Sequence, residues 1–248
     1  MFNFFVDEAK RHGDVFYIDG ADFNHIKNVL RMRVGDELLV SCTGKSHLCI
    51  IENFESDTAA VKITSEDYRS TELPVEIVLF QGLPKADKME LIIQKTVELG
   101  ISKIYPVEMN RCVVKLDAKK KNAKQSRWQA IAESAAKQSK RNTIPQIGEV
   151  LNYSDMLEEA KKLDLFLIPY ENKDGMLATK AALNEIKSGM KIGILIGPEG
   201  GFEESEIAAA ENTGGKTVSL GARILRTETA AITAVAMCML HIEMGENE

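Results

Sequence analysis

Two glycine-rich turns carry the residue types best suited to chemistry in this 248-residue chain. The first follows an apolar run at residues 191–196 and reads Gly-Pro-Glu-Gly-Gly over residues 197–201. The second follows a shorter run at residues 217–220 and reads Gly-Ala-Arg-Ile-Leu-Arg over residues 221–226. Glycine has no Cβ, so backbone amides in such turns can approach a ligand closely. The two turns therefore predict one pocket for a small molecule.

Two charged side chains in these turns are candidates for catalysis. Glu199 lies next to glycine, where packing does not require a carboxylate, and it is our candidate general base. Arg226 directly precedes a predicted helix, although the amino end of a helix favours anions. A residue that is unfavourable locally indicates a functional role, so we expect Arg226 to stabilise negative charge on a reacting group. The alternative for Glu199 is an ordinary solvated carboxylate.

The sequence lacks the patterns of the common nucleotide and metal sites. The first turn does not have the Gly-x-Gly-x-x-Gly spacing of dinucleotide-binding folds, and Gly44-Lys45-Ser46 lacks the first glycine of a phosphate loop. The four histidines have no metal-ligand spacing, and the four cysteines form neither a CxxC pair nor a disulfide framework. We therefore expect no metal and a reducing, cytoplasmic location.

The order of apolar runs predicts two domains. Residues 1–72 read as short strands at 15–18, 37–41, 49–54 and 59–63 with one helix at 22–29, which is typical of a small β-barrel. From residue 75 strands and helices alternate, so residues 73–248 predict an α/β domain whose mainly parallel sheet is covered by helices on both faces. The expected strands are 75–80, 103–107, 146–150, 163–169, 191–196 and 217–220, and the expected helices are 87–99, 122–140, 154–162, 176–187, 203–211 and 228–244.

The net charge of −6 conceals a basic zone at residues 84–141, which carries 14 basic and 6 acidic side chains. A local excess of Lys and Arg is what binding to a phosphate backbone requires. The lysine run at residues 119–121 is equally typical of a solvated helix face. No apolar run reaches the roughly 18 residues that a membrane span needs, and no signal-peptide pattern opens the chain. We expect a nucleic-acid partner and no membrane.

Three further blocks accompany the glycine turns in a fixed order. They are residues 25–31 with Gly35, residues 81–85 running on to 98–100, and residues 127–128 running on to 138–141. Together the five blocks resemble the SPOUT (trefoil-knot) RNA methyltransferases, and in detail the family that methylates N3 of uridine in small-subunit ribosomal RNA. The resemblance covers nearly the whole chain.

The resemblance implies a fold and a reaction that the residue pattern alone does not. The fold is an α/β SPOUT domain with a deep trefoil knot, which general fold rules disfavour, preceded by a PUA-like RNA-binding β-barrel. The partners are 16S ribosomal RNA in the small subunit and a second copy of the chain in a homodimer. The reaction is methylation of N3 of a uridine, at position 1498, by S-adenosyl-L-methionine.

The matched blocks also imply site residues, with Arg226 and Glu199 as the catalytic candidates. Leu195, Leu220, Ile224 and Leu225 supply apolar walls for the cofactor. The full cofactor set is Leu195, Ile196, Gly197, Pro198, Glu199, Gly200, Gly201, Leu220, Gly221, Ile224, Leu225, Thr229 and Ala230, with Pro169 and Tyr170 from a third loop that continues to Glu171. The RNA-binding set is Arg31, Lys85, Lys88, Arg111, Gln138 and Arg141.

Two alternatives remain open from the sequence. One is a ribose 2′-O methyltransferase of the same superfamily, which needs a base for a much weaker acid. The other is a ribosome-assembly factor that keeps the fold without catalysis, against which the intact glycine pocket argues. We expect Gly197→Val or Gly221→Val to abolish cofactor binding and leave the fold largely intact, because the added side chain would occupy the ligand's space.

Overall fold

The computed structural model divides the chain into two units and describes residues 1–170 and 175–245. Unit 1 consists of Met1–Glu72 and Ala136–Ile144, and unit 2 of Leu73–Ala135 and Pro145–Glu248. The chain therefore passes between the units three times, where the sequence predicted a single boundary. A fragment that begins at Leu73 would retain Ala136–Ile144 without the rest of their unit, so cofactor binding is better tested on the whole chain. Glu171 lies outside the described residues.

Unit 1 is built on a six-stranded sheet in the order β1-β4-β5-β6-β3-β2. Its pairs are antiparallel except for β1 with β4. The predicted strands are all present, and β1 and β2 are additional ones of three and two residues that are too short for a periodic signal. The strands are β1 Asn3–Phe5, β2 Arg11–His12, β3 Val15–Asp19, β4 Glu37–Cys42, β5 Lys45–Phe54 and β6 Thr58–Ser65.

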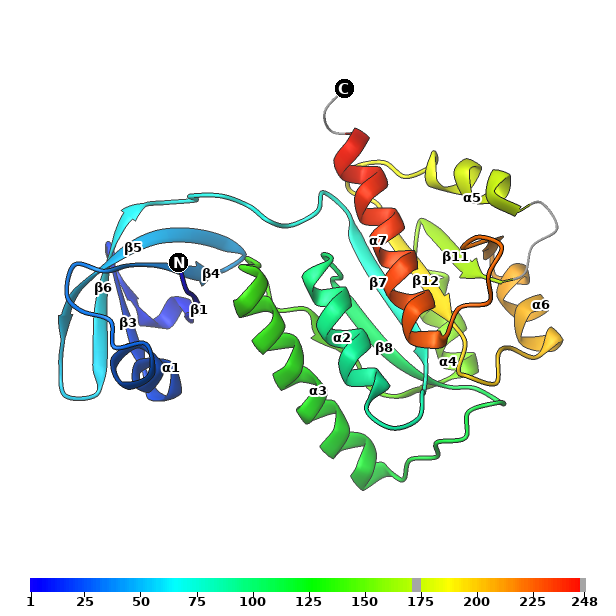
Figure 1. Ribbon diagram of the computed structural model, residues 1–248, viewed down its shortest axis with the longest axis horizontal. Coiled ribbons are helices and arrows are strands. Elements are labelled where there is room, and N and C mark those ends of the chain that lie inside the picture. Colours follow the sequence, from blue (N-terminus) through cyan, green and yellow to red (C-terminus); the bar gives the residue numbers. More distant parts are fainter. Residues whose placement is uncertain (171–174, 246–248) are drawn as a thin grey trace. The chain divides into compact units, whose positions relative to one another are not determined.

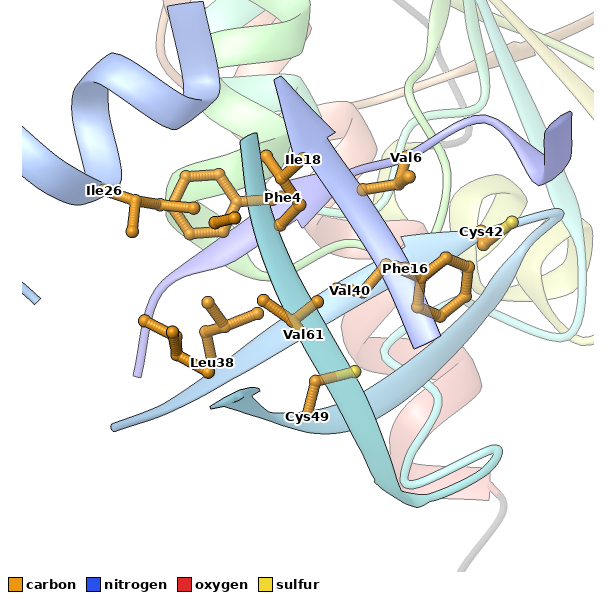
Figure 2. Packing of buried hydrophobic residues seen from close by; sticks show 12 residues of the cluster. Phe4, Val6, Phe16, Ile18, Ile26, Leu38, Val40, Cys42, Cys49 and Val61 are labelled. Atoms are coloured by element: carbon orange, nitrogen blue, oxygen red, sulfur yellow. The ribbon is translucent and has the colours of Figure 1, made fainter. Parts of the chain in front are cut away.

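The sheet of unit 1 encloses a hydrophobic core. Figure 2 shows Phe4, Phe16, Leu38 and Val61 converging from four different strands. A short 3-10 turn, Glu8–Lys10, follows β1. The predicted helix at 22–29 is α1 Gly20–Asn24, which continues into the π-helical turn His25–Val29 and buries Ile26 in the same core. The curled sheet and its core match the predicted β-barrel-like module.

Unit 2 contains a seven-stranded sheet in which every pair is parallel. The order is β10-β8-β7-β12-β11-β13, with β9 also paired to β8. The predicted strand at 146–150 is only the two-residue β9, and the equally short β10 begins directly after the predicted range. The strands are β7 Glu76–Gly82, β8 Lys103–Glu108, β9 Gln146–Ile147, β10 Leu151–Asn152, β11 Leu165–Pro169, β12 Lys191–Ile196 and β13 Lys216–Val218.

Helices cover both faces of this sheet, as the alternating pattern predicted. Figure 1 shows α2 and α7 side by side in front of the sheet and α4 behind it. The first turns of α7 and the carboxyl end of β12 lie close together, which brings the two glycine-rich turns to one edge of the sheet. The helices are α2 Lys88–Glu98, α3 Ala118–Ser139, α4 Tyr153–Ala160, α5 Gly175–Leu183, α6 Glu204–Asn212 and α7 Thr227–Gly245.

Helix α7 carries apolar residues on most of its sides. Ala231, Val235 and Cys238 are buried against the rest of unit 2, while Leu240 and Met244 are exposed. A search of the described helices for one able to cross a bilayer, by length and hydropathy, finds none.

Candidate functional site

A cavity of about 1260 Å³ opens at the carboxyl ends of β11, β12 and β13. Ligands of parallel α/β sheets bind at this edge, because the loops that follow the strands gather there. The cavity unites residues from all three loops that the sequence singled out. The predicted residues that line it are Pro169, Tyr170, Ile196, Gly197, Pro198, Glu199, Gly201, Leu220, Gly221, Ile224, Leu225, Arg226 and Ala230.

Three predicted cofactor residues do not line the cavity. Leu195 is fully buried in β12, where alternation along the strand turns its side chain into the core. Thr229 is exposed on the first turn of α7. Gly200 packs against Arg111, whose Nη1 donates to the Gly200 carbonyl at 3.2 Å, and a Cβ at Gly200 would lie 2.9 Å from Arg111 Cβ. Packing against Arg111 therefore accounts for this glycine.

Besides the catalytic candidate Arg226, eight cavity residues lie outside the predicted cofactor set. The additional residues are Lys88, Gly175, Met176, Phe202, Ser219, Ala222, Arg223 and Thr227. Arg223 and Thr227 belong to the second turn and its helix start, so the argument that selected Arg226 extends to them. Lys88 was predicted as an RNA contact, because its sequence context gave only a positive charge in the basic zone, and the structure places it at the cavity. Met176 comes from α5, where no motif marks it.

Glu199 is held by a backbone amide and a lysine. Its Oε1 accepts from the Lys85 N–H at 3.0 Å and lies 3.1 Å from Lys88 Nζ. Burial alone would raise the pKa of Glu199, but the hydrogen bonds from Lys85 and Lys88 outweigh it and hold the pKa below its usual range. An efficient general base has a pKa close to the operating pH. The geometry therefore favours Glu199 as an anchor of the first turn over the predicted role as a base.

Lys88 connects three segments beside the cavity. Besides Glu199, its Nζ lies 3.3 Å from Oε2 of Glu228 on the first turn of α7. The hydrogen bond to Glu199 raises the pKa of Lys88, so the ammonium stays charged. Glu228 Oε2 is buried and accepts no hydrogen bond of good geometry. One cation is thus shared by two carboxylates, which leaves this cluster with a net negative charge.

Arg226 is exposed and lines the cavity immediately before α7. Among the described carboxylates, none forms an ion pair with its guanidinium. Its backbone carbonyl accepts from the Ala230 N–H at 2.8 Å, which fixes the residue to the start of the helix. Within the described residues, the side chain is therefore a cation at the cavity without a carboxylate partner.

The two key glycines are restricted for different reasons. Gly221 has φ +105°, which L residues rarely adopt, and its N–H donates to Ser219 Oγ at 3.1 Å. A Cβ on Gly197 would lie 3.2 Å from the Phe202 ring. Valine would therefore strain the backbone at residue 221 and displace Phe202 at residue 197. Either substitution would therefore disturb its own turn as well as fill ligand space, so loss of cofactor binding alone would not separate the two effects.

Arg141, a predicted RNA contact, is buried in unit 1. Its side chain is 3% exposed, and its Nε donates to both oxygens of Glu72 at 2.9 and 3.0 Å. Burial alone would raise the pKa of Glu72, but the hydrogen bonds and charge of Arg141 and the N–H of Asn142 hold it below the usual range. A guanidinium enclosed in this way has no surface for a phosphate. Its position supports a structural role in unit 1.

The other predicted RNA contacts reach the surface. Arg31 is exposed in unit 1 with φ +53°, and Gln138 is exposed near the end of α3. Lys85 and Arg111 are exposed in unit 2. Nothing in their geometry distinguishes an RNA contact from an ordinary surface charge.

Metal and thiol chemistry have little support in the part of the chain that the structure describes. No group of three or more His, Cys, Asp or Glu side chains there is arranged to hold a metal ion. All four cysteines are unpaired and buried, and burial raises the pKa of Cys49 and Cys238 to about 12. Such thiols are poor nucleophiles.

Comparisons with known proteins cover both units. Residues 71–239 match the model of an RNA methyltransferase domain, and residues 18–64 match that of an RNA methyltransferase PUA domain. The chain is 35% identical over 98% of its length to ribosomal RNA small subunit methyltransferase E of Bacillus subtilis, and covers 98% of that protein.

Two solved structures are similar to the chain along almost its whole length. A ribosomal RNA small subunit methyltransferase E from Neisseria gonorrhoeae, bound to S-adenosyl methionine, has a TM-score of 0.78 and 34% identity and covers 96% of each chain. A putative methyltransferase from Legionella pneumophila with the cofactor bound has a TM-score of 0.81 and 31% identity, over 96% of this chain and 97% of the other.

Proposed function

The chain belongs to the RNA methyltransferase family that includes ribosomal RNA small subunit methyltransferase E, and on that premise we propose its reaction. The protein transfers the methyl group of S-adenosylmethionine to N3 of a uridine in 16S ribosomal RNA. The observation that carries the proposal is the convergence of both glycine turns and the unpaired Arg226 on one cavity.

The cavity suits the cofactor's shape and chemistry. Its volume of about 1260 Å³ leaves room for the cofactor and an acceptor base. Leu220 and Leu225 provide apolar walls for an adenine ring, and Tyr170 meets Phe202 edge-on at 6.2 Å between ring centroids beside them. Backbone amides of the glycine turns supply polar contacts close to the ligand. When bound, the cofactor supplies an electrophilic methyl group on a sulfonium.

Methyl transfer to uridine N3 is an in-line displacement. The N3–carbon bond forms as the carbon–sulfur bond breaks, and the N3 proton leaves before or during attack. Loss of that proton places negative charge on N3 and on the uracil O2 and O4 oxygens. In our proposal the Arg226 guanidinium binds one of these oxygens and stabilises the anion, which lowers the pKa of N3–H.

The N3 proton passes to solvent in this mechanism. Glu199 is held by Lys85 and Lys88 with a lowered pKa, so it is a poor acceptor. An arginine that stabilises the uracil anion makes a strong protein base unnecessary, because water and hydroxide accept the proton of a weakly acidic imide. This feature favours uridine N3 over a ribose 2′-hydroxyl, which is a much weaker acid and needs a positioned base.

Two measurements test the proposal. Titration calorimetry should show binding of S-adenosylmethionine and of its demethylated product to the whole chain. Nucleoside mass spectrometry of small-subunit RNA should show 3-methyluridine lost from cells without the protein and restored on its return. Loss of a ribose-methylated nucleoside would favour the 2′-O alternative, and no change in any nucleoside would favour an assembly factor.

The family resemblance supports three further parts of the proposal. Unit 1 contributes RNA affinity through exposed cations such as Arg31, and the chain forms a cytoplasmic homodimer with a trefoil knot around the cofactor. The exposed Leu240 and Met244 on α7 offer apolar surface for a partner copy. Sedimentation equilibrium measures the dimer directly, and a monomer at micromolar concentration would contradict it.

A further inference from the structure

A chain of hydrogen bonds connects three segments behind the cavity. The Thr227 hydroxyl donates to the Gly197 carbonyl at 2.7 Å, and Gln81 Nε2 donates to Thr227 Oγ1 at 2.9 Å. Gln81 lies on β7, Gly197 follows β12, and Thr227 is the first residue of α7. The same Nε2 donates to the Gly82 carbonyl at 2.9 Å, so both of its protons have acceptors and the amide orientation is fixed.

The donors and acceptors of these hydrogen bonds follow one direction, from Gln81 through Thr227 to Gly197. A hydroxyl has a single proton, and Thr227 commits it to Gly197 while its oxygen accepts from Gln81. Gln81 is fully buried and Thr227 is 6% exposed, so water competes little with these bonds. In such surroundings successive hydrogen bonds strengthen one another, and a missing member leaves its neighbours without partners.

The Gly197 carbonyl is the final acceptor of these hydrogen bonds. Fixing its oxygen fixes the plane of the Gly197–Pro198 peptide, and both residues line the cavity. From behind, Gly82 contacts the same peptide so closely that a Cβ there would lie 2.6 Å from Pro198 N. Thr227 is also bonded covalently to Arg226, so one hydroxyl joins the first glycine turn to the cation that lines the same cavity.

We propose that Thr227 is a positioning residue: its hydroxyl aligns the Gly197 peptide with Arg226, so that cofactor affinity and methyl transfer both depend on it. The inference rests on the proposed function. It predicts that cofactor affinity and methylation rate change together, because a change at Thr227 moves both the Gly197 turn, which contacts the cofactor, and Arg226, which contacts the base.

The test compares variants of the whole chain that differ by single groups. Thr227→Val keeps the shape and removes the hydroxyl, and Thr227→Ser keeps the hydroxyl. Gln81→Met removes the hydrogen bonds from Nε2 to Thr227 and to the Gly82 carbonyl, and leaves the bond from Thr227 to Gly197 in place. Thr96→Val is the matched control, because Thr96 is fully buried in the same unit and donates to the Ile92 carbonyl at 2.7 Å. The readouts are calorimetric Kd for S-adenosylmethionine, single-turnover rate at saturating cofactor, and Tm.

Thr227→Val should raise Kd about tenfold and lower the saturated rate by a similar factor, the equivalent of losing one buried hydrogen bond. Thr227→Ser should restore both to within about threefold, Gln81→Met should move both in the same direction by a smaller factor, and Thr96→Val should change only Tm. A purely structural role would lower Tm and leave the saturated rate alone.

The positioning role of Thr227 and the proposed function can be refuted separately. If the wild-type protein binds cofactor and methylates RNA while Thr227→Val and Gln81→Met match it in Kd and rate, the positioning role is overturned and the proposed function stands. Failure of Thr227→Ser to restore the valine variant's losses would also overturn the role. A wild-type protein with no affinity for the cofactor would overturn the proposed function and this inference with it.

Discussion

Charged clusters in the two units differ in how completely their carboxylates are paired with cations and hydrogen-bond donors. In unit 1, Arg141 and Glu72 form a buried pair, and the N–H groups of Asn142 and Thr143 donate to the same carboxylate. In unit 2, Lys88 serves both Glu199 and Glu228, and one buried oxygen of Glu228 lacks a hydrogen bond. Beside that cluster, Arg226 lines the cavity, and no carboxylate in the described part of the chain is paired to it.

The difference separates a structural cluster from a functional one. A buried charge with all of its hydrogen bonds made stabilises its own surroundings and has nothing left for a ligand. An incompletely neutralised cluster costs stability, and such sites are expected where function requires them. By this criterion, we assign the unit 1 arginine to the fold and propose that the unit 2 arginine acts on the substrate, although the sequence presented both as functional candidates.

The largest expected effect is on the stability of unit 1. Arg141→Met should lower its free energy of unfolding by about 3 kcal/mol, the lower end of the range for a broken buried pair. The reason is that ionised Glu72, whose side chain is 22% exposed, would lose its charged partner. Arg127→Met is the control: Arg127 is 68% exposed in its ion pair with Glu90, and a surface pair contributes at most about 1 kcal/mol. Urea unfolding measures both. A stable Arg141→Met protein with weakened RNA binding would reverse the assignment.

Arg226→Ala should lower the single-turnover methylation rate about 10²- to 10³-fold, the usual effect of removing one donor to a developing anion. RNA affinity should change far less, because the interaction strengthens only as charge develops. Raising the pH should restore part of the rate, since hydroxide then removes the N3 proton. Equal losses of RNA affinity and rate, with no response to pH, would place Arg226 in docking.

Glu199→Gln should lower the rate by less than about tenfold and leave its pH profile unchanged, because we assign the proton transfer to solvent. Loss of a true general base would cost about 10²- to 10⁴-fold. Rate measurements between pH 6 and pH 9 distinguish the two cases. A fall within the larger range, with the basic limb of the profile shifted, would restore Glu199 as the base.

The smallest expected effect is the acid sensitivity of unit 1. The pKa of Glu72 is lower in the folded protein than in the unfolded chain, so its contribution to stability is present above the ordinary glutamate pKa. That contribution disappears as the pH falls from about 4.3 through the folded value. In Tm measurements across this interval, Glu72→Gln should start from a lower Tm and lose less of it than wild type. Parallel curves would contradict the linkage.

Local pattern was enough to place most elements of this chain. The strand at residues 191–196 was predicted with the bounds that β12 has, because a buried apolar run ends abruptly in glycine. The loops that build the cavity followed, since parallel strands end at one edge. The three-residue β1 was missed because it gains its stability from pairing with β4, about 35 residues away.

The roles of charged residues were harder to predict than the elements, because the sequence shows a charge but not the residue that pairs with it. Lys88 and Arg141 have similar basic neighbourhoods along the chain. The structure pairs Lys88 with two carboxylates at the cavity and Arg141 with Glu72, about 70 positions earlier. Only tertiary contacts distinguish these roles.

The strand order of unit 2 has a consequence for how the protein is made. β7 lies between β8 and β12, and its six-residue pairing with β12 cannot form until Lys191–Ile196 has been synthesised. Until then an apolar strand edge is left open, and such an edge recruits other chains. We therefore expect nascent chains that stop before residue 191 to need chaperone protection, and the last quarter of translation to complete both the sheet and the cavity at its edge.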